Sequence, residues 1–395
     1  MSPEPGAVTE LFRARFGQAA DGVWLAPGRA NLMGEHTDYN EGFVLPFALG
    51  QGIVAAAARR ADRRLVLCSA QEPDSAADVA LDGLAPGRVT GWAAYPAGVA
   101  WALAAAGYQV PGACLAIDSD VPAGAGLSSS AALECVTALA LTELAGPPGL
   151  AGPTGPTGDR RQLAAIARRA ENDFVGVPSG IMDQSASLLS QRGHALLLDC
   201  RSLETSQVPF DPGAWDSCLL LINTRARHEL TAGQYGRRRA ECEQAARLLG
   251  VPSLRYLTDV ADVARLADPV LRRRARHVVT DDQRVLDVVA LLSGGADPYP
   301  GIGRLLVQAH ESLRDDFEVS WPEADAAVDA AVAAGALGAR MIGGGFGGSV
   351  LALARPEAAG PVRAAVAEAF ARRSWTAPEF LAAAPSASAR RLGLQ

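Results

Sequence analysis

A dense polar segment at residues 28–40 constrains this chain more than any other feature of its sequence. It carries a guanidinium, two carboxylates, an imidazole, a hydroxyl, a phenol and two amides. The stretches on either side, residues 24–27 and 43–47, are apolar and typical of strands. Placing so many polar groups between two strands costs free energy unless hydrogen bonds compensate them. Their donors and acceptors match a polyhydroxylated ligand such as a sugar, so we expect the segment to bind one.

Length and composition indicate a globular, core-forming protein. The chain has 395 residues, of which 49% are hydrophobic and 20% are charged, so we expect one large domain or two of ordinary size. The net charge of −7 argues against nucleic acid or an anionic membrane as the main partner. Two short arginine runs, residues 237–239 and 272–274, are interpreted as solvated helix faces.

The sequence contains no lysine, and all 36 of its Lys or Arg positions are arginine. This absence excludes several active sites whose chemistry requires a lysine amine. A Walker A phosphate loop, a protein-kinase active site, a pyridoxal Schiff base and a Schiff-base aldolase all depend on one. If the chain binds ATP, it must neutralise the phosphates by other means.

The six cysteines, at positions 68, 114, 135, 200, 218 and 242, have the spacing of neither a zinc site nor a disulfide framework. The first residues lack the charged and apolar pattern of a signal peptide, and the apolar stretches are too short to span a membrane. We therefore expect a reduced, cytoplasmic protein with no membrane contact.

Hydrophobic periodicity predicts strands and helices in mixed order in the first half of the chain. Strands are expected at 23–26, 43–55, 65–69 and 113–119, and helices at 8–16, 88–106, 128–144 and 161–174. Pro96 should distort or restart the helix at 88–106. Glycine recurs at every third position from 146 to 158, a collagen-like pattern too short for a triple helix, so an extended loop is predicted there.

The strand predicted at 194–199 and a turn near 209–213 indicate a seam around residue 205. We therefore expect an N-terminal lobe at 1–205 and a C-terminal lobe at 206–395. The second lobe should contain helices near 232–249, 281–292 and 322–334 and a strand at 349–354. Because strands and helices do not alternate steadily, an α+β fold is favoured over a doubly wound sheet.

A turn rich in glycine and proline, residues 122–127, joins the strand at 113–119 to the following helix. Gly124 and Gly126 would allow backbone N–H groups to converge on an anion. Ser128, Ser129 and Ser130 then begin the helix, whose amides and dipole favour phosphate. A serine hydroxyl there could also bind Mg²⁺. The alternative is that these serines are ordinary N-caps.

Asp183 lies in an apolar setting shortly after Gly180, where a carboxylate costs free energy unless it is paired. Arg29, in the first polar segment, is its natural partner. The alternative is that Asp183 caps a helix. Glu171 precedes this stretch, and its alternative interpretation is an exposed position on a surface helix.

Several signals are weaker alone. Trp92 and Tyr95 lie one helical turn apart and could sandwich an adenine, although core packing is the alternative. Tyr235 could close over a ligand or be an ordinary surface tyrosine. The glycine loop 343–348 could approach a ligand or the first polar segment through its backbone, or form a tight turn. The histidines at 194, 228, 277 and 310 show no metal spacing and are interpreted as structural.

Three motifs, in order along the chain, resemble those of the GHMP small-molecule kinases, a family that also contains homoserine and mevalonate kinases. Residues 28–39, GRANLMGEHTDY, resemble the galactokinase signature of that family. Residues 122–132 resemble the wider family's phosphate loop, and residues 343–348 its third motif. Residues 180–184 and 199–205 also match, so the resemblance covers nearly the whole chain.

The resemblance implies a two-lobed α+β fold, the GHMP kinase fold, with ATP and a sugar meeting in the inter-domain cleft. It implies a sugar 1-kinase of the galactokinase type, which transfers phosphate from ATP to the C1 hydroxyl of α-D-galactose in galactose catabolism. We expect it to be a monomer. The alternatives are a kinase for N-acetylgalactosamine or arabinose, and a non-catalytic sensor of galactose and ATP.

The matched motifs also imply residue roles. Asp183 would face the C1 hydroxyl as general base, with Arg29 beside it, although in a loose transition state it could serve mainly to position that hydroxyl. Ser130 and Glu171 would bind Mg²⁺. The sugar would be held by Glu35, His36, Thr37, Asp38, Gly180 and Tyr235. The phosphates of ATP would be wrapped by Gly124, Ala125, Gly126, Leu127, Ser128, Ser129 and Ser130, and its adenine flanked by Trp92 and Tyr95.

Overall fold

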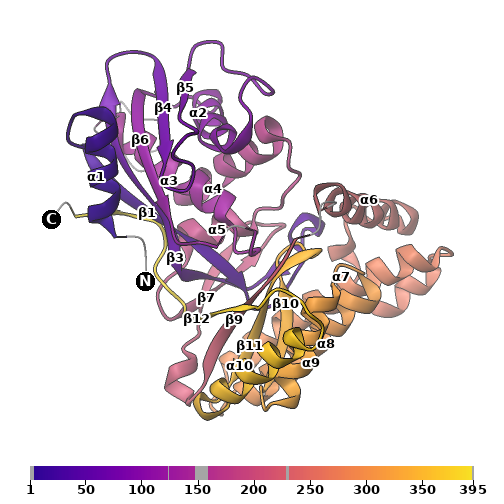
Figure 1. Cartoon of the computed structure of the whole chain (residues 1–395). Coiled ribbons are helices and arrows are strands. Elements are labelled where there is room, and N and C mark those ends of the chain that lie inside the picture. Colours follow the sequence, from indigo (N-terminus) through magenta and orange to yellow (C-terminus); the bar gives the residue numbers. More distant parts are fainter. Residues whose placement is uncertain (1–3, 123, 147–158, 228–230, 394–395) are drawn as a thin grey trace.

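A computed structural model describes residues 4–122, 124–146, 159–227 and 231–393 as two lobes, the first above the second in Figure 1. The first lobe is built on a six-stranded sheet in the order β13-β1-β3-β6-β4-β5. Neighbouring strands are antiparallel except β4 and β6. The strands are β1 (Gly22–Asn31), β3 (Pro46–Arg60), β4 (Arg64–Ser69), β5 (Ala77–Ala80), β6 (Gly112–Ser119) and β13 (Arg390–Leu392).

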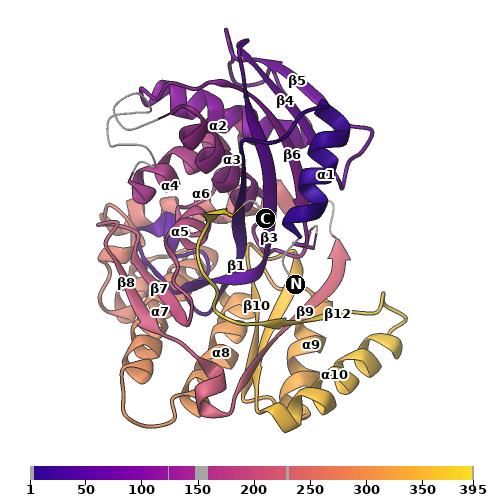
Figure 2. The same cartoon turned by 90° about the vertical axis from the view of Figure 1, so that its left-hand side faces the viewer.

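Helices cover both faces of this sheet, as Figure 2 shows. On one face α1 (Pro5–Phe16) buries Val8 and Phe12 against β3 and β6. The other face carries α2 (Ala94–Ala105), α3 (Ser129–Leu144), α4 (Arg160–Arg169) and α5 (Met182–Leu189). Because both faces are covered, every residue of β1 is buried, which explains why its first six residues, 22–27, carry no polar side chain.

The helix predicted at 88–106 is shorter than expected. A 3₁₀ turn, Gly91–Ala93, precedes α2, which begins at Ala94. Pro96 therefore lies in the first helical turn, where its missing N–H has no intrahelical partner to lose. The predicted loop at 146–158 lies almost wholly outside the described residues. The helix predicted at 161–174 is α4 followed by a π-helical turn, Ala170–Val175, which carries Glu171.

The second lobe contains an antiparallel four-stranded sheet in the order β10-β11-β9-β12. Its strands are β9 (Cys218–Arg227), β10 (Gly338–Ile342), β11 (Gly347–Ala354) and β12 (Glu379–Ala383). Its helices are α6 (Thr231–Leu249), α7 (Pro269–Leu292), α8 (Tyr299–Glu311), α9 (Pro322–Ala333) and α10 (Pro356–Ala371). The sequence predicted only the second half of α7, and neither α8 nor α10.

A small third sheet joins β2 (Phe43–Val44), β7 (His194–Asp199) and β8 (Thr205–Pro209). One buried cluster contains Leu32 and Phe47 from the first half of the chain together with Leu221 and Leu353 from the second, so the two lobes share a core. The chain end also links them, since β12 pairs with β9 and β13 pairs with β1. The lobe boundary at 205/206 stays a prediction.

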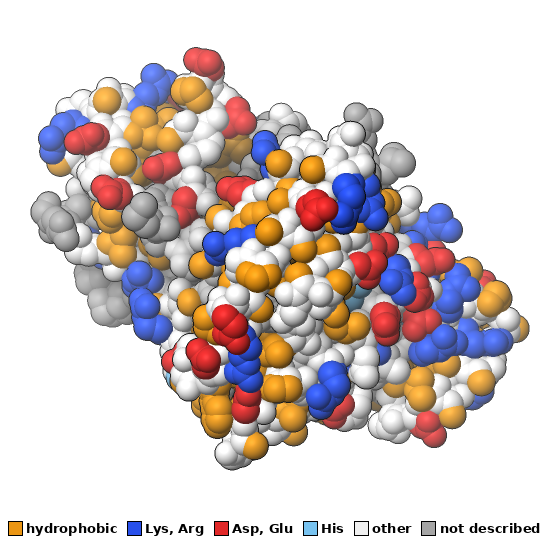
Figure 3. Space-filling view, turned by 60° about the horizontal axis from the view of Figure 1, so that its bottom comes forward, with side chains coloured by type: hydrophobic (Ala, Val, Ile, Leu, Met, Phe, Trp, Pro, Cys, Tyr) orange, Lys and Arg blue, Asp and Glu red, His pale blue; other side chains and the backbone are white. Residues whose placement is uncertain are grey.

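The two arginine runs are not simply solvated, contrary to the sequence-based interpretation. On the face shown in Figure 3, arginine and acidic side chains lie intermixed. Arg274 is only 2% exposed, and its guanidinium donates to Glu241 at 2.7 Å and to the Asp316 carbonyl at 2.6 Å. Arg238 donates to the Phe317 carbonyl at 2.7 Å. These buried guanidiniums therefore tie α6 and α7 to the segment after α8.

No helix in the described part of the chain is long and apolar enough to cross a membrane.

Gly303→Ala should destabilise the second lobe. A Cβ at Gly303 would lie 2.2 Å from the Leu337 carbonyl oxygen, where α8 packs on the start of β10. Because a backbone atom cannot easily give way, we expect the free energy of unfolding in urea to fall by about 2 kcal/mol or more. Gly6→Ala in α1 is the control, since its Cβ would meet nothing within 4 Å. Equal losses in the two variants would contradict this close contact.

Candidate active site

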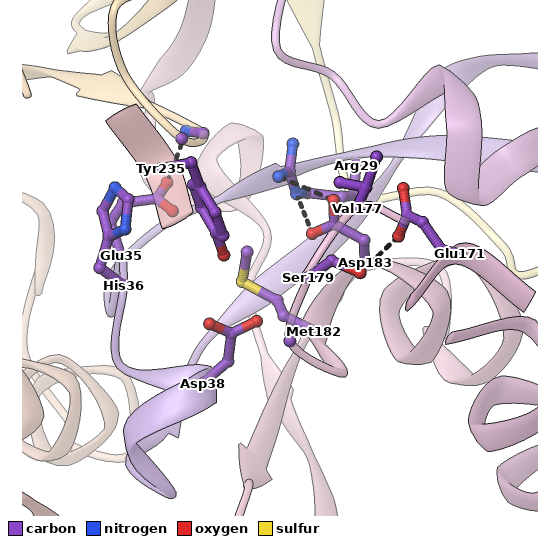
Figure 4. Close-up of a pocket in the computed structure, with 13 residues that line it drawn as sticks. Arg29, Glu35, His36, Asp38, Glu171, Val177, Ser179, Met182, Asp183 and Tyr235 are labelled. Carbon is purple, nitrogen blue, oxygen red and sulfur yellow. Dashed lines mark hydrogen bonds and ion pairs between the residues drawn. The ribbon is translucent and has the colours of Figure 1, made fainter. Parts of the chain in front are cut away.

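A cavity of about 160 Å³ lies at the junction of the lobes and is lined by eight of the predicted site residues (Figure 4). They come from β1 and the loop after it, the π-helical turn, the loop before α5, α5 itself and α6. These eight are Arg29, Glu35, His36, Asp38, Glu171, Gly180, Asp183 and Tyr235. Sequence reasoning gave no role at this cavity to Val177, Ser179 and Met182, which also line it, and Gly343 and Gly344 of the third motif complete the lining.

Arg29 and Asp183 form a two-bond ion pair. The Nε and Nη2 of Arg29 lie 2.9 Å and 3.1 Å from the two carboxylate oxygens of Asp183. Its Nη1 donates to the Gly126 carbonyl at 2.6 Å. The Arg29 side chain is 6% exposed and that of Asp183 26%, so the pair is largely shielded from water and still faces the cavity. Such bidentate pairs fix orientation as well as charge.

The turn at 124–130 adjoins this pair directly. Ser128 has a left-handed backbone, with φ of 58°, and its hydroxyl donates to Asp183 in place of capping α3. The N-cap alternative for Ser128 is therefore not what the structure shows. Because its side chain does not cap the helix, the first amides of α3 have no side-chain acceptor there. Gly28 permits this closeness, since a Cβ there would lie 2.6 Å from the Leu127 carbonyl.

Glu171 is buried rather than exposed on a helix surface, with 5% of its area accessible. Its Oε2 accepts hydrogen bonds from the Ser179 hydroxyl at 2.5 Å and from Gln184 Nε2 at 2.9 Å. Ser130 also hydrogen-bonds to this carboxylate. Burial raises the pKa of Glu171, while the hydrogen bond from Ser179 opposes the rise.

Glu35 and Asp38 present carboxylates to the cavity from the first polar segment. Arg340 Nη2 and the Gly343 amide both donate to Glu35 Oε1, at 2.8 Å and 2.9 Å. Burial raises the pKa of Glu35 despite this pairing. Burial, with the nearby charge of Asp183, raises the pKa of Asp38 to about 6. A Cβ at Gly180 would lie 1.8 Å from Asp38 Oδ2, so glycine there leaves room for this carboxylate.

His36 and Tyr235 close one side of the cavity with their rings, whose centroids are 5.3 Å apart. His36 Nδ1 lies 2.9 Å from the Tyr39 hydroxyl, and its ring also packs against Phe317. Burial, followed by the influence of His277, lowers the pKa of His36 to about 3, so its imidazole is neutral at physiological pH. Tyr235 lines the cavity from α6 and is therefore not an ordinary surface tyrosine.

Thr37 does not line the cavity. Its side chain is fully buried, and its hydroxyl lies 2.6 Å from the Phe43 carbonyl and 3.0 Å from the Gly34 carbonyl. It therefore fastens the loop that presents its neighbours. Trp92 and Tyr95 do not line the cavity and pack at the edge of the hydrophobic core of the first lobe. Trp92 Nε1 donates to the Ser75 carbonyl.

The remaining loop residues lie around the turn. Gly124 lines a separate cavity of about 760 Å³ beside Arg225. Ala125 and Leu127 are buried, and their carbonyls accept hydrogen bonds from Ser349 and from the Arg29 amide. Ser129 and Ser130 form the first turn of α3.

Helix α7 holds the first polar segment in place, which the sequence gave no means to foresee. His277 Nε2 lies 3.0 Å from the Glu35 carbonyl oxygen. Asp281 accepts from the Glu35 amide at 3.0 Å, and Asp282 accepts from the Phe43 amide at 2.7 Å. Arg340 was equally unforeseen, although a lone arginine in an apolar strand just before a glycine loop is a usable signal. Both features orient Glu35 from the second lobe.

Family models and solved structures identify the class of protein. The models for the GHMP kinases N terminal domain and the GHMP kinases C terminal domain match residues 94–191 and 299–372. A mevalonate kinase from Methanococcus jannaschii has the same fold, with a TM-score of 0.64 at 15% identity over 92% of this chain and 98% of that one. The expected α+β GHMP kinase fold is thus confirmed.

The branch within that class follows from closer similarities. The model for the galactokinase galactose-binding signature matches residues 10–59. Galactokinases of Streptomyces coelicolor and Homo sapiens are 51% and 43% identical over 98% and 88% of this chain, and 98% and 87% of theirs. A Lactococcus lactis galactokinase solved with galactose has a TM-score of 0.90 at 32% identity, covering 98% of this chain and 99% of that one. The chain belongs to the galactokinase family, and it is a sugar kinase with ATP as co-substrate.

Asp282→Asn should change how stability depends on pH. Burial raises the pKa of Asp282 from 3.8 to about 7, so this carboxyl favours the folded state fully below pH 3.8 and that contribution is lost as pH rises to about 7. The asparagine keeps an oxygen for the Phe43 amide and does not ionise. Urea titrations from pH 4 to 8 should show the variant gaining stability relative to the parent up to about pH 7. A difference that is constant across this range would contradict the assignment.

Proposed function

We propose that the protein catalyses ATP-dependent phosphorylation of α-D-galactose at the C1 hydroxyl, giving galactose 1-phosphate and beginning galactose catabolism. The observation that carries this proposal is the position of the Asp183 carboxylate. It lies between the cavity and the turn at 124–130, held by Arg29 and Ser128. The relative solved with galactose and the match to the galactose-binding signature support the choice of sugar.

The cavity suits a polyhydroxylated ligand. Glu35 and Asp38 offer acceptors, His36 offers a neutral ring nitrogen, and Tyr235 offers a hydroxyl. We assign these four side chains and the backbone at Gly180 to the sugar. Thr37 supports them indirectly, because its hydroxyl is used by two backbone carbonyls of the same loop.

Phosphoryl transfer needs alignment and charge neutralisation more than covalent chemistry. Asp183 would hold the C1 hydroxyl and receive its proton, while Arg29 neutralises charge that develops next to it. The turn at 124–130 and the amides at the start of α3 would bind the phosphates of ATP. In a chain without lysine, these groups replace the amine that other phosphate loops use. Trp92 and Tyr95, both partly exposed, are our proposed flanks for the adenine.

We propose Mg²⁺ as the metal, held by Ser130 and Glu171. Their side chains share a hydrogen bond, so both oxygens can reach one cation, and hard oxygen ligands suit Mg²⁺. Among the described residues no group of three or more His, Cys, Asp or Glu side chains could hold a metal alone. Phosphate oxygens and water would complete the coordination, as is usual for this ion. When bound, Mg²⁺ neutralises phosphate charge.

A coupled ADP-release assay over a panel of sugars, with and without Mg²⁺, tests this function. Galactose should give the highest kcat/KM and only in the presence of Mg²⁺. A higher value with N-acetylgalactosamine or arabinose would reassign the substrate, and binding without turnover would indicate a sensor. We further propose a monomeric cytoplasmic enzyme, which light scattering after gel filtration checks by giving the mass of one chain.

Asp183→Asn should abolish most turnover while galactose still binds. The amide can neither accept the C1 proton nor form the charged pair with Arg29, so we expect kcat to fall by about 100-fold or more. Calorimetric titration should show that galactose affinity changes little. Asp173→Asn is the control, because this exposed carboxylate pairs with Arg169 away from the cavity. Unchanged turnover in Asp183→Asn would refute the role given to Asp183.

A further inference from the structure

Glu134 is a fully buried acid that the mechanism above does not use. It lies on α3 one turn after Ser130, and its exposed fraction is 0%. Its Oε2 accepts a hydrogen bond from Gln184 Nε2 at 3.0 Å. Its Oε1 has no hydrogen-bond partner, and no cation pairs with it, within the residues that the structure describes. A buried carboxylate without a cation is costly, so its charge state needs an explanation.

Gln184 links this acid to the proposed metal site. It follows Asp183 on α5, and its Nε2 donates both to Glu134 Oε2 at 3.0 Å and to Glu171 Oε2 at 2.9 Å. The amide presents nitrogen on this side, because its oxygen would repel the Glu171 carboxylate oxygen. Gln184 Oε1 is then left buried and, in the described part of the chain, without a donor.

The two oxygens without a hydrogen-bond partner are Glu134 Oε1 and Gln184 Oε1, and these two side chains already share a hydrogen bond. Both are acceptors if Glu134 is ionised, and neither can then satisfy the other. A proton on Glu134 Oε1 turns that oxygen into a donor toward Gln184 Oε1. The acid and the amide would then be joined by two hydrogen bonds, and no buried polar atom of either side chain would remain unpaired.

We propose that Glu134 is a neutral carboxylic acid whose pairing with the Gln184 amide positions Glu171 for Mg²⁺. This inference rests on the proposed function, in which Glu171 is a metal ligand. With its amide fixed, Gln184 joins Ser179 at Glu171 Oε2, so neither of these two donors occupies Oε1, the oxygen that we assign to the cation. Glu134 is thus a positioning residue that acts through Gln184 and touches neither substrate nor metal.

The charge environment agrees with this pairing. Burial raises the pKa of Glu134 well above its usual range, and the neighbouring Glu171 raises it further. An ionised Glu134 would add a second buried negative charge beside Glu171. A neutral Glu134 keeps the local charge on the residue that binds the metal.

Infrared spectroscopy of the metal-free protein tests the protonation state without any assay of activity. The parent should show the C=O stretching band of a protonated carboxyl group at pH 8.5, above the pKa of about 7 of Asp282, with a small shift in D₂O. The difference between the spectra of the parent and Glu134→Gln should contain this band, and the variant should remain folded, because an amide can form the same two hydrogen bonds with Gln184. A spectrum in which Glu134→Gln loses only carboxylate bands would overturn the proposal.

A titration of activity with Mg²⁺ tests the positioning role. Glu134→Gln should keep the parent's half-saturating Mg²⁺ concentration. Glu134→Leu frees the Gln184 amide and should raise this concentration roughly tenfold with the KM for galactose unchanged, since partners of metal ligands commonly have effects of that size. Gln184→Leu should do the same and serves if Glu134→Leu does not fold. Equal impairment in Glu134→Gln and Glu134→Leu, or unchanged Mg²⁺ response in both leucine variants, would contradict the role.

These two experiments separate the inference from the function on which it rests. If the parent shows no Mg²⁺-dependent release of ADP with any sugar, the proposed function fails. The infrared result then still decides whether Glu134 carries its proton.

Discussion

The ion pair between Arg29 and Asp183 is the interaction on which the rest of the site depends. Burying two opposite charges is tolerated only when their geometry is good and their remaining hydrogen-bonding groups are satisfied. Here the guanidinium makes two bonds to the carboxylate and a third to the Gly126 carbonyl, while Ser128 donates to the same carboxylate. Satisfying these groups forces β1, the turn before α3 and the start of α5 to meet at one point. We propose that the phosphates of ATP and a sugar hydroxyl also meet at that point.

The second lobe completes the site by holding the first polar segment from outside. Arg340 on β10 pairs with Glu35, and His277, Asp281 and Asp282 on α7 hold the backbone around it. The ion pair between β1 and α5 of the first lobe and these contacts from the second lobe therefore face each other across the cavity. Because the lobes also share a core, a change in the packing of α7 or β10 would move the side chains that we propose bind the sugar relative to Asp183.

Local sequence patterns predicted much of the fold and of the site. Contacts between residues that lie far apart in the sequence could not be predicted. The cost of burying polar groups predicted that the polar segment between two strands binds a ligand and that Asp183 pairs with Arg29. Periodicity and turn residues predicted the strand, glycine turn and helix at 113–144. Helices α8 and α10 were missed because Gly301, Gly303 and Pro361 interrupt their patterns. The role of Thr37 could not be foreseen, because only the fold shows that two carbonyls occupy its hydroxyl. Glu134 could not be foreseen either, because its partner is 50 residues away.

A double-mutant cycle on kcat/KM most directly tests whether Arg29 and Asp183 act as one unit. The four proteins are the parent, Arg29→Gln, Asp183→Asn and the double variant, each assayed with galactose and ATP. If two residues act as a unit, removing either one removes most of their joint contribution. The kcat/KM of the double variant should therefore be no lower than that of the less active single variant. If the two losses multiply instead, the guanidinium and the carboxylate act independently, and the account of this active site is wrong.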